Sequence, residues 1–225
     1  MPRPRDPERF GHLVATAVEV FIERGYSQTQ VGHIAEAMGV AKGTIYLYVE
    51  SKEALFDLAI RGARGDLEPH AALPVPTPEP EATLRYVRDA IAVDLRLPRL
   101  EAALQQPRTD DPRSELTEIV RELYQLVSRH RVALKLVDRS ATEYPDLAAI
   151  FFDMARQAIP QLLLQYLESR LPKDHALPLP ALARGIVEIV AFWALHHHWD
   201  PAPTPVSERE SEDAAVLLAL GALGP

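Results

Sequence analysis

The sequence predicts an all-α fold, in which an N-terminal three-helix module is followed by a larger helical domain. Apolar residues recur every three or four positions along most of the 225 residues, and no segment alternates with a period of two. The 20 prolines and 10 glycines punctuate these periodic segments. Because 47% of the residues are hydrophobic, the chain can bury a core, and wholesale disorder is excluded.

The N-terminal module is predicted from helix periodicity and from residues that start or end helices. The first helix lies between Pro7 and Gly25, and glycine suits the left-handed position that follows a helix end. Further helices are expected over residues 30–38, 42–48 and 51–68. The Ser51 hydroxyl can cap the last of these, with Glu53 in its first turn.

A proline-rich segment marks the predicted domain boundary. Five prolines occur from Pro69 to Pro80, a composition that excludes a helix interior, so the predicted domains are residues 1–68 and 69–225. Helices in the second domain are expected over residues 81–106, 112–142, 146–171, 181–199 and 207–223. Asp111 followed by Pro112 supplies a capping carboxylate and a proline at the first helical position.

Composition and charge exclude several classes of protein. The chain has no cysteine, so disulfide frameworks, thiolate metal sites and cysteine nucleophiles are excluded. No signal peptide and no apolar run of about 20 residues is found, so we expect a cytoplasmic protein that does not enter a membrane. The net charge of −8 lies in residues 66–225, because acidic and basic residues balance over residues 1–65. The N-terminal module can therefore approach an anion.

The segment from His33 to Leu55 has the spacing of a helix-turn-helix. Two helices that cross over a tight turn need a small residue, a turn residue that tolerates left-handed geometry, and an apolar plug on the second helix; Ala35, Gly39 and Ile45 occupy these places. Polar side chains surround the second helix, namely Lys42, Thr44, Tyr46, Tyr48 and Lys52. Ammonium and hydroxyl groups on a short helix suit DNA phosphates and the major groove. A purely structural hairpin with core tyrosines is the alternative.

Four consecutive motifs in this region resemble a known family. They are F-x-x-x-G-Y at Phe21–Tyr26, I-A-x-x-x-G-V at Ile34–Val40, K-G-T-I-Y-x-Y-V at Lys42–Val49 and S-K-E-A-L at Ser51–Leu55. Residues 9–58 thereby resemble the N-terminal DNA-binding domain of the TetR family of bacterial transcriptional repressors. The resemblance implies a homodimer that binds double-stranded operator DNA and releases it when a small effector occupies a C-terminal helical ligand-binding and dimerisation domain. No enzymatic activity and no cofactor are implied.

The resemblance also implies which residues contact DNA. They are Gln30, His33, Lys42, Gly43, Thr44, Tyr46, Leu47, Tyr48 and Lys52. Lysines and tyrosines in this set are expected to hold phosphates, and Thr44 is expected to face base edges. Three positions depart from the family pattern. Ala41 replaces a frequent capping serine, Gly32 replaces a long polar side chain, and Leu47 can contact a thymine methyl group.

The helices of the second domain supply candidates for effector binding and dimerisation. Candidate effector residues, chosen as aromatic groups with polar anchors, are Tyr86, Arg88, Tyr124, His130, Phe151, Phe152 and Trp193. Candidate dimer-interface residues, which form apolar stripes on the last two helices, are Ile186, Ile189, Val190, Trp193, Val216, Leu217, Leu220 and Leu223. The alternative for both sets is the core of the monomer. The helix beginning at Ser51 is expected to be the only connection between the two domains.

Two other functions stay open. His196 and Asp200 have the four-residue spacing of helical metal ligands, but three consecutive histidines point about 100° apart and do not converge on one ion. A metal-dependent enzyme is therefore the weaker alternative, and we expect no metal. A helical protein-interaction module that does not bind DNA is the other.

Overall fold

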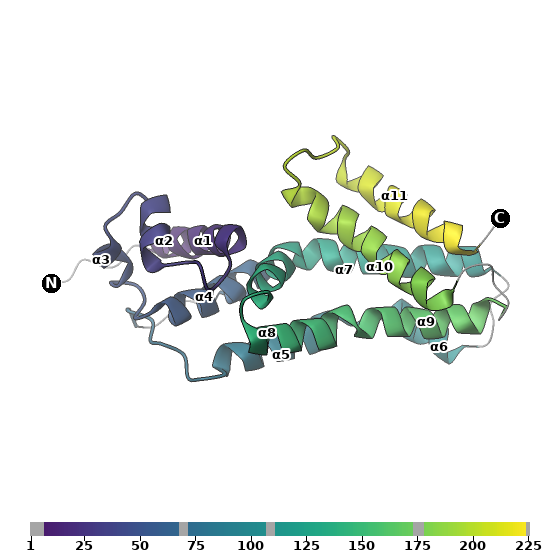
Figure 1. Ribbon diagram of the computed structural model, residues 1–225, viewed down its shortest axis with the longest axis horizontal. Helices are drawn as coiled ribbons and strands as arrows, with labels where there is room; N and C mark the ends of the chain where they lie inside the picture. Colours follow the sequence, from purple (N-terminus) through teal and green to yellow (C-terminus); the bar gives the residue numbers. More distant parts are fainter. Residues whose placement is uncertain (1–6, 68–71, 107–110, 173–177, 224–225) are drawn as a thin grey trace. The chain divides into compact units, whose positions relative to one another are not determined.

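The computed structural model describes residues 7–67, 72–106, 111–172 and 178–223, and it confirms the all-α class (Figure 1). Within these ranges the chain forms helices and connecting segments, with one isolated bridge between Val49 and Val75. The chain divides into two compact units: Met1–Ala90 with Val132–Phe151, and Ile91–Arg131 with Phe152–Pro225. These units divide two helices of the second predicted domain, so the functional boundary at residue 69 stays a prediction.

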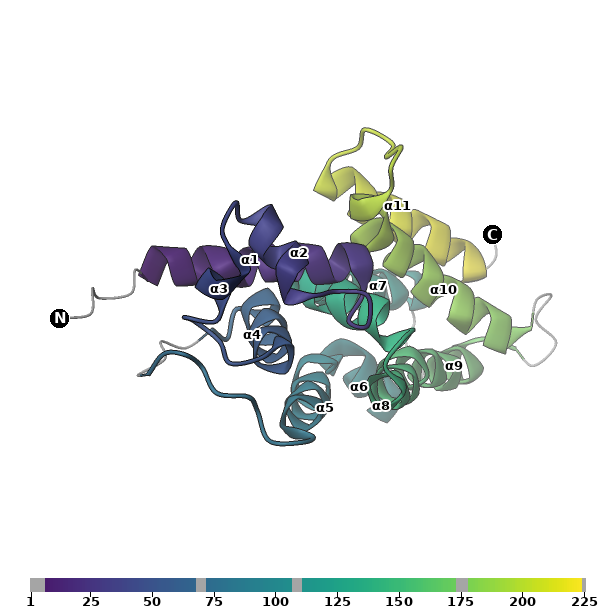
Figure 2. The ribbon, with the colours of Figure 1, turned by 60° about the vertical axis from the view of Figure 1, so that its left-hand side comes forward.

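The N-terminal helices belong to the first unit. They are α1 (Pro7–Arg24), α2 (Val31–Ala37), α3 (Lys42–Ile45) and α4 (Lys52–Arg64). Helix α1 packs along α4 (Figure 2), and the ring of Phe21 meets that of Phe56 edge-on at 5.0 Å. Gly25 ends α1 with a φ of 80°, as predicted, and the Ser51 hydroxyl accepts a hydrogen bond from the Ala54 amide at 3.1 Å. Helix α4 ends at Arg64, earlier than predicted, because Gly65 adopts a φ of 90°.

The remaining helices follow the predicted order with three breaks. They are α5 (Ala82–Asp94), α6 (Pro98–Gln105), α7 (Pro112–Ala141), α8 (Pro145–Ile150), α9 (Ala158–Arg170), α10 (Leu179–Ala194) and α11 (Glu208–Leu220). The helix predicted over 81–106 is interrupted because Pro98 forces the preceding residue out of helical geometry. The helix predicted over 146–171 is interrupted by a π-helical turn at Phe151–Arg156, and the one over 181–199 ends in a 3₁₀ turn at His196–Trp199.

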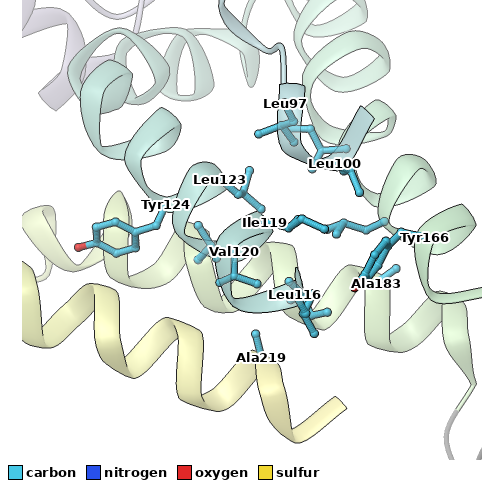
Figure 3. Close-up of a cluster of buried hydrophobic side chains, with 14 of the residues drawn as sticks. Leu97, Leu100, Leu116, Ile119, Val120, Leu123, Tyr124, Tyr166, Ala183 and Ala219 are labelled. Atoms are coloured by element: carbon cyan, nitrogen blue, oxygen red, sulfur yellow. The ribbon is translucent and has the colours of Figure 1, made fainter. Parts of the chain in front are cut away.

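The core of the second unit lies among α6, α7, α9, α10 and α11 (Figure 3). Its largest members include Leu97, Leu100, Leu116, Ile119, Leu123, Tyr124 and Tyr166. A buried ion pair adds a polar connection, because Arg170 Nε lies 2.8 Å from Glu115 Oε2 and Arg170 Nη2 donates to the Ala103 carbonyl at 2.8 Å. This guanidinium ties α9 to α7 and α6.

Candidate nucleic-acid interface

The turn between α2 and α3 is fixed by a complete helix-ending motif. Gly39 has a φ of 66°, and its amide donates to the Glu36 carbonyl at 2.9 Å. The Val40 amide donates to the Ala35 carbonyl, also at 2.9 Å. This pair of bonds is the Schellman motif, in which glycine avoids the steric cost of left-handed geometry. The predicted role of Gly39 is therefore confirmed, and the turn sets the direction in which α3 leaves α2.

Helix α3 presents a small exposed surface. Ile45 is buried, whereas Lys42 and Gly43 are exposed and Thr44 is half-buried. Just beyond the helix, Tyr46 is 42% exposed and Leu47 is 52% exposed. Ala41 provides no side-chain cap, as expected for alanine at this position. Its carbonyl accepts a hydrogen bond from the Thr44 amide at 2.8 Å. Five of the predicted DNA-contacting residues are thus brought together on α3 and the two residues that follow it. We call Lys42, Gly43, Thr44, Tyr46 and Leu47 the reading surface.

The proline-rich segment contributes to this region, which sequence reasoning missed. The Val75 amide donates to the Tyr48 carbonyl at 2.8 Å, and the Glu50 amide donates to the Val75 carbonyl at 3.0 Å. Thr77 adds bonds from its amide to Glu50 Oε2 at 3.0 Å and from its hydroxyl to Ser51 Oγ at 2.9 Å. Residues 75–77, which we call the strap, therefore hold the chain immediately after the reading surface. The sequence offered one indication of this contact, namely Val75, an apolar residue isolated between two prolines.

Two predicted DNA contacts are turned toward the helices of residues 7–67, which we call the head, and do not join the reading surface; Tyr48 is buried and Lys52 is half-buried. Tyr48 is buried, with its ring 6.4 Å from that of Phe10. Lys52 Nζ donates to the Tyr26 carbonyl at 2.9 Å and to the Thr29 carbonyl at 3.1 Å, and it lies 4.2 Å from the centre of the Tyr26 ring. Burial lowers the pKa of Lys52, although the Glu53 carboxylate opposes this shift. In the free protein, both side chains stabilise the head from within.

Gln30 and His33 lie at the start of α2. The Gln30 amide donates to His33 Nδ1 at 3.2 Å, and the His33 amide donates to the Gln30 carbonyl at 3.0 Å. Because Nδ1 accepts a hydrogen bond, neutral His33 carries its proton on Nε2. Gln30 is exposed and His33 is half-buried, so both flank α2 without joining the reading surface.

The turn after α1 contacts the corner between α7 and α8, within the first unit. Arg139 Nη2 donates to the Arg24 carbonyl at 2.9 Å, and the Ser27 hydroxyl donates to the Glu143 carbonyl at 3.2 Å. The rings of Tyr26 and Tyr144 stack at 5.3 Å. The prediction that α4 alone connects the head to the rest of the chain is therefore wrong. The prediction considered only the covalent connection through α4. The corner between α7 and α8 lies more than 110 residues after the turn that it contacts.

The candidate effector residues are not gathered in one described cavity. Tyr124 belongs to the core, Phe151 is buried, and Arg88 is exposed. The Tyr86 hydroxyl donates to Asp66 Oδ2 at 2.7 Å, while Phe152 and Trp193 are half-buried beside Arg156 and His197. A cavity of about 610 Å³ lies within the second unit, at the end of α5, the start of α6 and one face of α7. Among the seven candidates, only His130 lines it.

The candidate dimer stripes divide between core and surface. Ile186, Val190 and Val216 are buried, and Ile189, Trp193, Leu220 and Leu223 are half-buried. Leu217 is 70% exposed. Two neighbours that were not predicted, Leu218 and Phe192, are also exposed, so α10 and α11 retain an apolar outer surface.

The geometry gives no support to the metal alternative. Among the described residues, no group of three or more histidine, aspartate or glutamate side chains is placed to hold an ion. His197 Nε2 lies 2.8 Å from the Thr204 carbonyl, and Asp200 Oδ1 accepts from the Ala202 amide at 2.9 Å. His198 lies beside Arg131 and Glu208. None of the described helices is long and apolar enough to cross a membrane.

Comparisons with known proteins place the similarity in the head. Residues 13–59 match the family described as bacterial regulatory proteins, tetR family. The fatty acid metabolism regulator protein of Bacillus subtilis is 51% identical over 45 residues, which are 20% of this chain and 23% of that protein. The transcriptional repressor KstR2 of Rhodococcus jostii is 40% identical over 55 residues, which are 24% of this chain and 27% of that protein. The matched segment thus spans about a quarter of these relatives.

Two solved structures share the fold over nearly the whole chain. The ketosteroid transcriptional regulator KstR2 of Mycobacterium tuberculosis has a TM-score of 0.53 at 18% identity, covering 97% of this chain and 95% of that one. A bacterial regulatory protein in the tetR family from Rhodococcus RHA1 has a TM-score of 0.51 at 18% identity, covering 97% of this chain and 98% of that one. At this identity, the likeness establishes the fold of the helical body.

Proposed function

Because residues 13–59 match the family of bacterial regulatory proteins described as tetR family, we propose that the whole chain is a ligand-responsive transcriptional regulator. It acts as a repressor that leaves a palindromic operator when a small effector binds to the helical body. As a regulator of operator DNA, it is proposed to act in the cytoplasm. The observation that carries the proposal is the reading surface, which combines exposed cationic, hydroxyl and apolar groups on α3 and the two residues that follow it.

The reading surface suits the major groove because its groups match different parts of DNA. Lys42 and the Tyr46 hydroxyl donate to phosphate oxygens, while Thr44 and Leu47 face base edges and a thymine methyl group. Gly43 allows the backbone to approach closely. Gln30 and the Nε2 proton of His33 flank these contacts from α2. Tyr48 and Lys52 contribute indirectly: Tyr48 is buried, and the half-buried Lys52 donates to two carbonyls, so both hold the chain that carries the reading surface.

Specific binding requires two copies. One short helix contacts only a few base pairs, whereas a two-fold dimer presents two such helices to successive major grooves about 34 Å apart. We assign the dimer interface to the outer faces of α10 and α11. The exposed side chains of Leu217, Leu218 and Phe192 support this assignment, because apolar surface of this kind is stabilised by burial against a second copy.

Selection from a randomised duplex library tests the proposal and requires no known operator. The wild-type chain should enrich an inverted repeat. The variant Lys42→Ala combined with Tyr46→Phe should lose binding to that repeat, whereas Arg85→Ala, which removes an exposed cation on α5, should keep it. If no sequence is enriched, or if both variants bind alike, the chain is not a sequence-specific regulator acting through this surface. The interaction-module alternative would then gain support.

A further inference from the structure

The cavity in the second unit has a charged lining that the candidate effector residues did not predict. Four arginines, three carboxylates, one glutamine and one histidine line it together with three apolar residues. The break between α5 and α6 at Pro98 opens it, and α7 forms its other wall. Its volume of about 610 Å³ lies in the range of small-molecule sites.

Two of the three carboxylates are bonded to groups of Arg99. Glu118 Oε2 lies 2.8 Å from Arg99 Nη1. Both carboxylate oxygens of Glu122 accept from the Arg99 amide at 3.1 Å, so Glu122 caps the start of α6 from α7. The third, Asp94, lies 3.7 Å from His130 Nδ1. These groups are therefore occupied in shaping the cavity.

The arginines are less completely neutralised by the lining. Arg96 pairs with Glu101 through two bonds of 2.7 and 2.6 Å, but Glu101 lies outside the cavity lining. Arg129 is exposed, and over the described ranges its guanidinium makes no ion pair or hydrogen bond. Arg99 pairs with Glu118, and Arg121 lies 3.8 Å from Glu118 and 3.7 Å from Asp213. Over the described residues, Arg129 is therefore the arginine of the lining whose donors stay available. A guanidinium with free donors binds carboxylate, sulfonate or phosphate groups through paired hydrogen bonds.

Apolar residues in the same lining indicate the rest of the ligand. Val93 is 67% exposed at one edge, and Leu126 forms a buried part of the wall. We propose that this cavity binds a small organic anion, with its acidic group at Arg129 and its apolar body against Val93 and Leu126. The inference that this anion is the effector rests on the proposed function. The inference that the cavity binds an organic anion does not depend on it.

A pair of fluorescent probes tests the inference directly. 8-Anilinonaphthalene-1-sulfonate carries a sulfonate on an apolar ring system, and N-phenyl-1-naphthylamine has the same rings without the acid. The sulfonate should bind the wild-type chain about tenfold more tightly, because a hydrogen-bonded charge is worth that much when it is partly desolvated. Arg129→Gln should remove this preference and leave the neutral probe unaffected. Arg209→Gln, at an exposed arginine of α11 outside the lining, should change neither affinity.

The outcomes separate this inference from the proposed function. Val93→Asn should weaken both probes, since it removes apolar contact without changing charge. The anion site would be overturned if the two probes bind with equal affinity, or if Arg129→Gln leaves the affinity for the sulfonate probe unchanged. Either result would count even if the chain binds its operator. A chain that shows the Arg129-dependent preference but binds no DNA would retain the anion site, and the regulator proposal alone would fail.

Discussion

Replacing Gly43 with alanine separates the needs of the fold from the needs of DNA binding. Gly43 lies in α3 with ordinary helical geometry, and a Cβ atom built there meets no atom within 4 Å. Nothing in the free protein requires glycine. Alanine in a helix is favoured over glycine by up to about 1 kcal/mol, which in a chain of this size raises the melting temperature by about 2–4 °C. We expect the variant to fold at least as stably as the wild type.

Operator affinity should change in the opposite direction. If the Gly43 backbone lies against DNA, a methyl group displaces the reading surface and lengthens neighbouring hydrogen bonds. A loss of about 1 kcal/mol per half-site, the worth of one such bond, becomes about 2 kcal/mol in a dimer and lowers affinity about 30-fold. Gly32→Ala is the matched control. Its Cβ also meets nothing within 4 Å, it gains the same helix preference in α2, and it should leave affinity unchanged.

Thermal unfolding and fluorescence anisotropy with a labelled operator measure the two quantities separately. The reasoning is refuted if Gly43→Ala binds with wild-type affinity, because this position then does not face DNA. It is also refuted if the variant is clearly destabilised, because the open surroundings of Gly43 would then be incorrect.

Four further predictions use the same assays with sedimentation and denaturation. Lys42→Ala should make the slope of log affinity against log salt shallower by about 2, one phosphate contact for each half-site. Lys52→Met should lower the melting temperature without changing that slope, because its ammonium group binds the Tyr26 and Thr29 carbonyls; a slope that falls instead would place Lys52 at a phosphate. Leu217→Asp should sediment as a folded monomer, and a dimer would move the interface away from α11. Burial, reinforced by Arg131, lowers the pKa of His198 below its usual 6.5, so the unfolded chain takes up protons first as the pH falls and stability declines below about pH 6.5. Urea unfolding at pH 7.5 and 5.5 should show a smaller decline for His198→Gln, and equal declines would contradict this assignment.

Helix ends and turns could be predicted from the sequence because they depend on interactions between residues close together in the chain. Gly25 and Gly39 are needed for left-handed backbone, Ser51 caps the residue three positions later, and Asp111 accepts from the Ser114 amide at 3.0 Å. Each depends on neighbours within one helical turn. The presence of the helices and the helix-turn-helix could therefore be predicted, and the structure confirms both.

The directions of side chains could not be predicted in the same way. Tyr48 has the right type and spacing for a DNA contact, but α3 ends at Ile45 and the chain then turns its ring toward Phe10. Lys52 is directed inward by carbonyl groups more than 20 residues earlier in the chain. The cavity depends on the helix break that Pro98 imposes, and this proline was present in the segment expected to be one helix.

The division between buried and exposed side chains on α3 and the turn that follows it also has a consequence for evolution and design. Ile45, Tyr48 and the strap maintain the backbone, whereas Lys42, Tyr46 and Leu47 expose their side chains to solvent. Mutations on the outer side can therefore accumulate with little effect on folding. A library randomised at these three outer positions should consist mostly of folded proteins, and it offers a direct route to variants that recognise new DNA sequences while keeping the same scaffold.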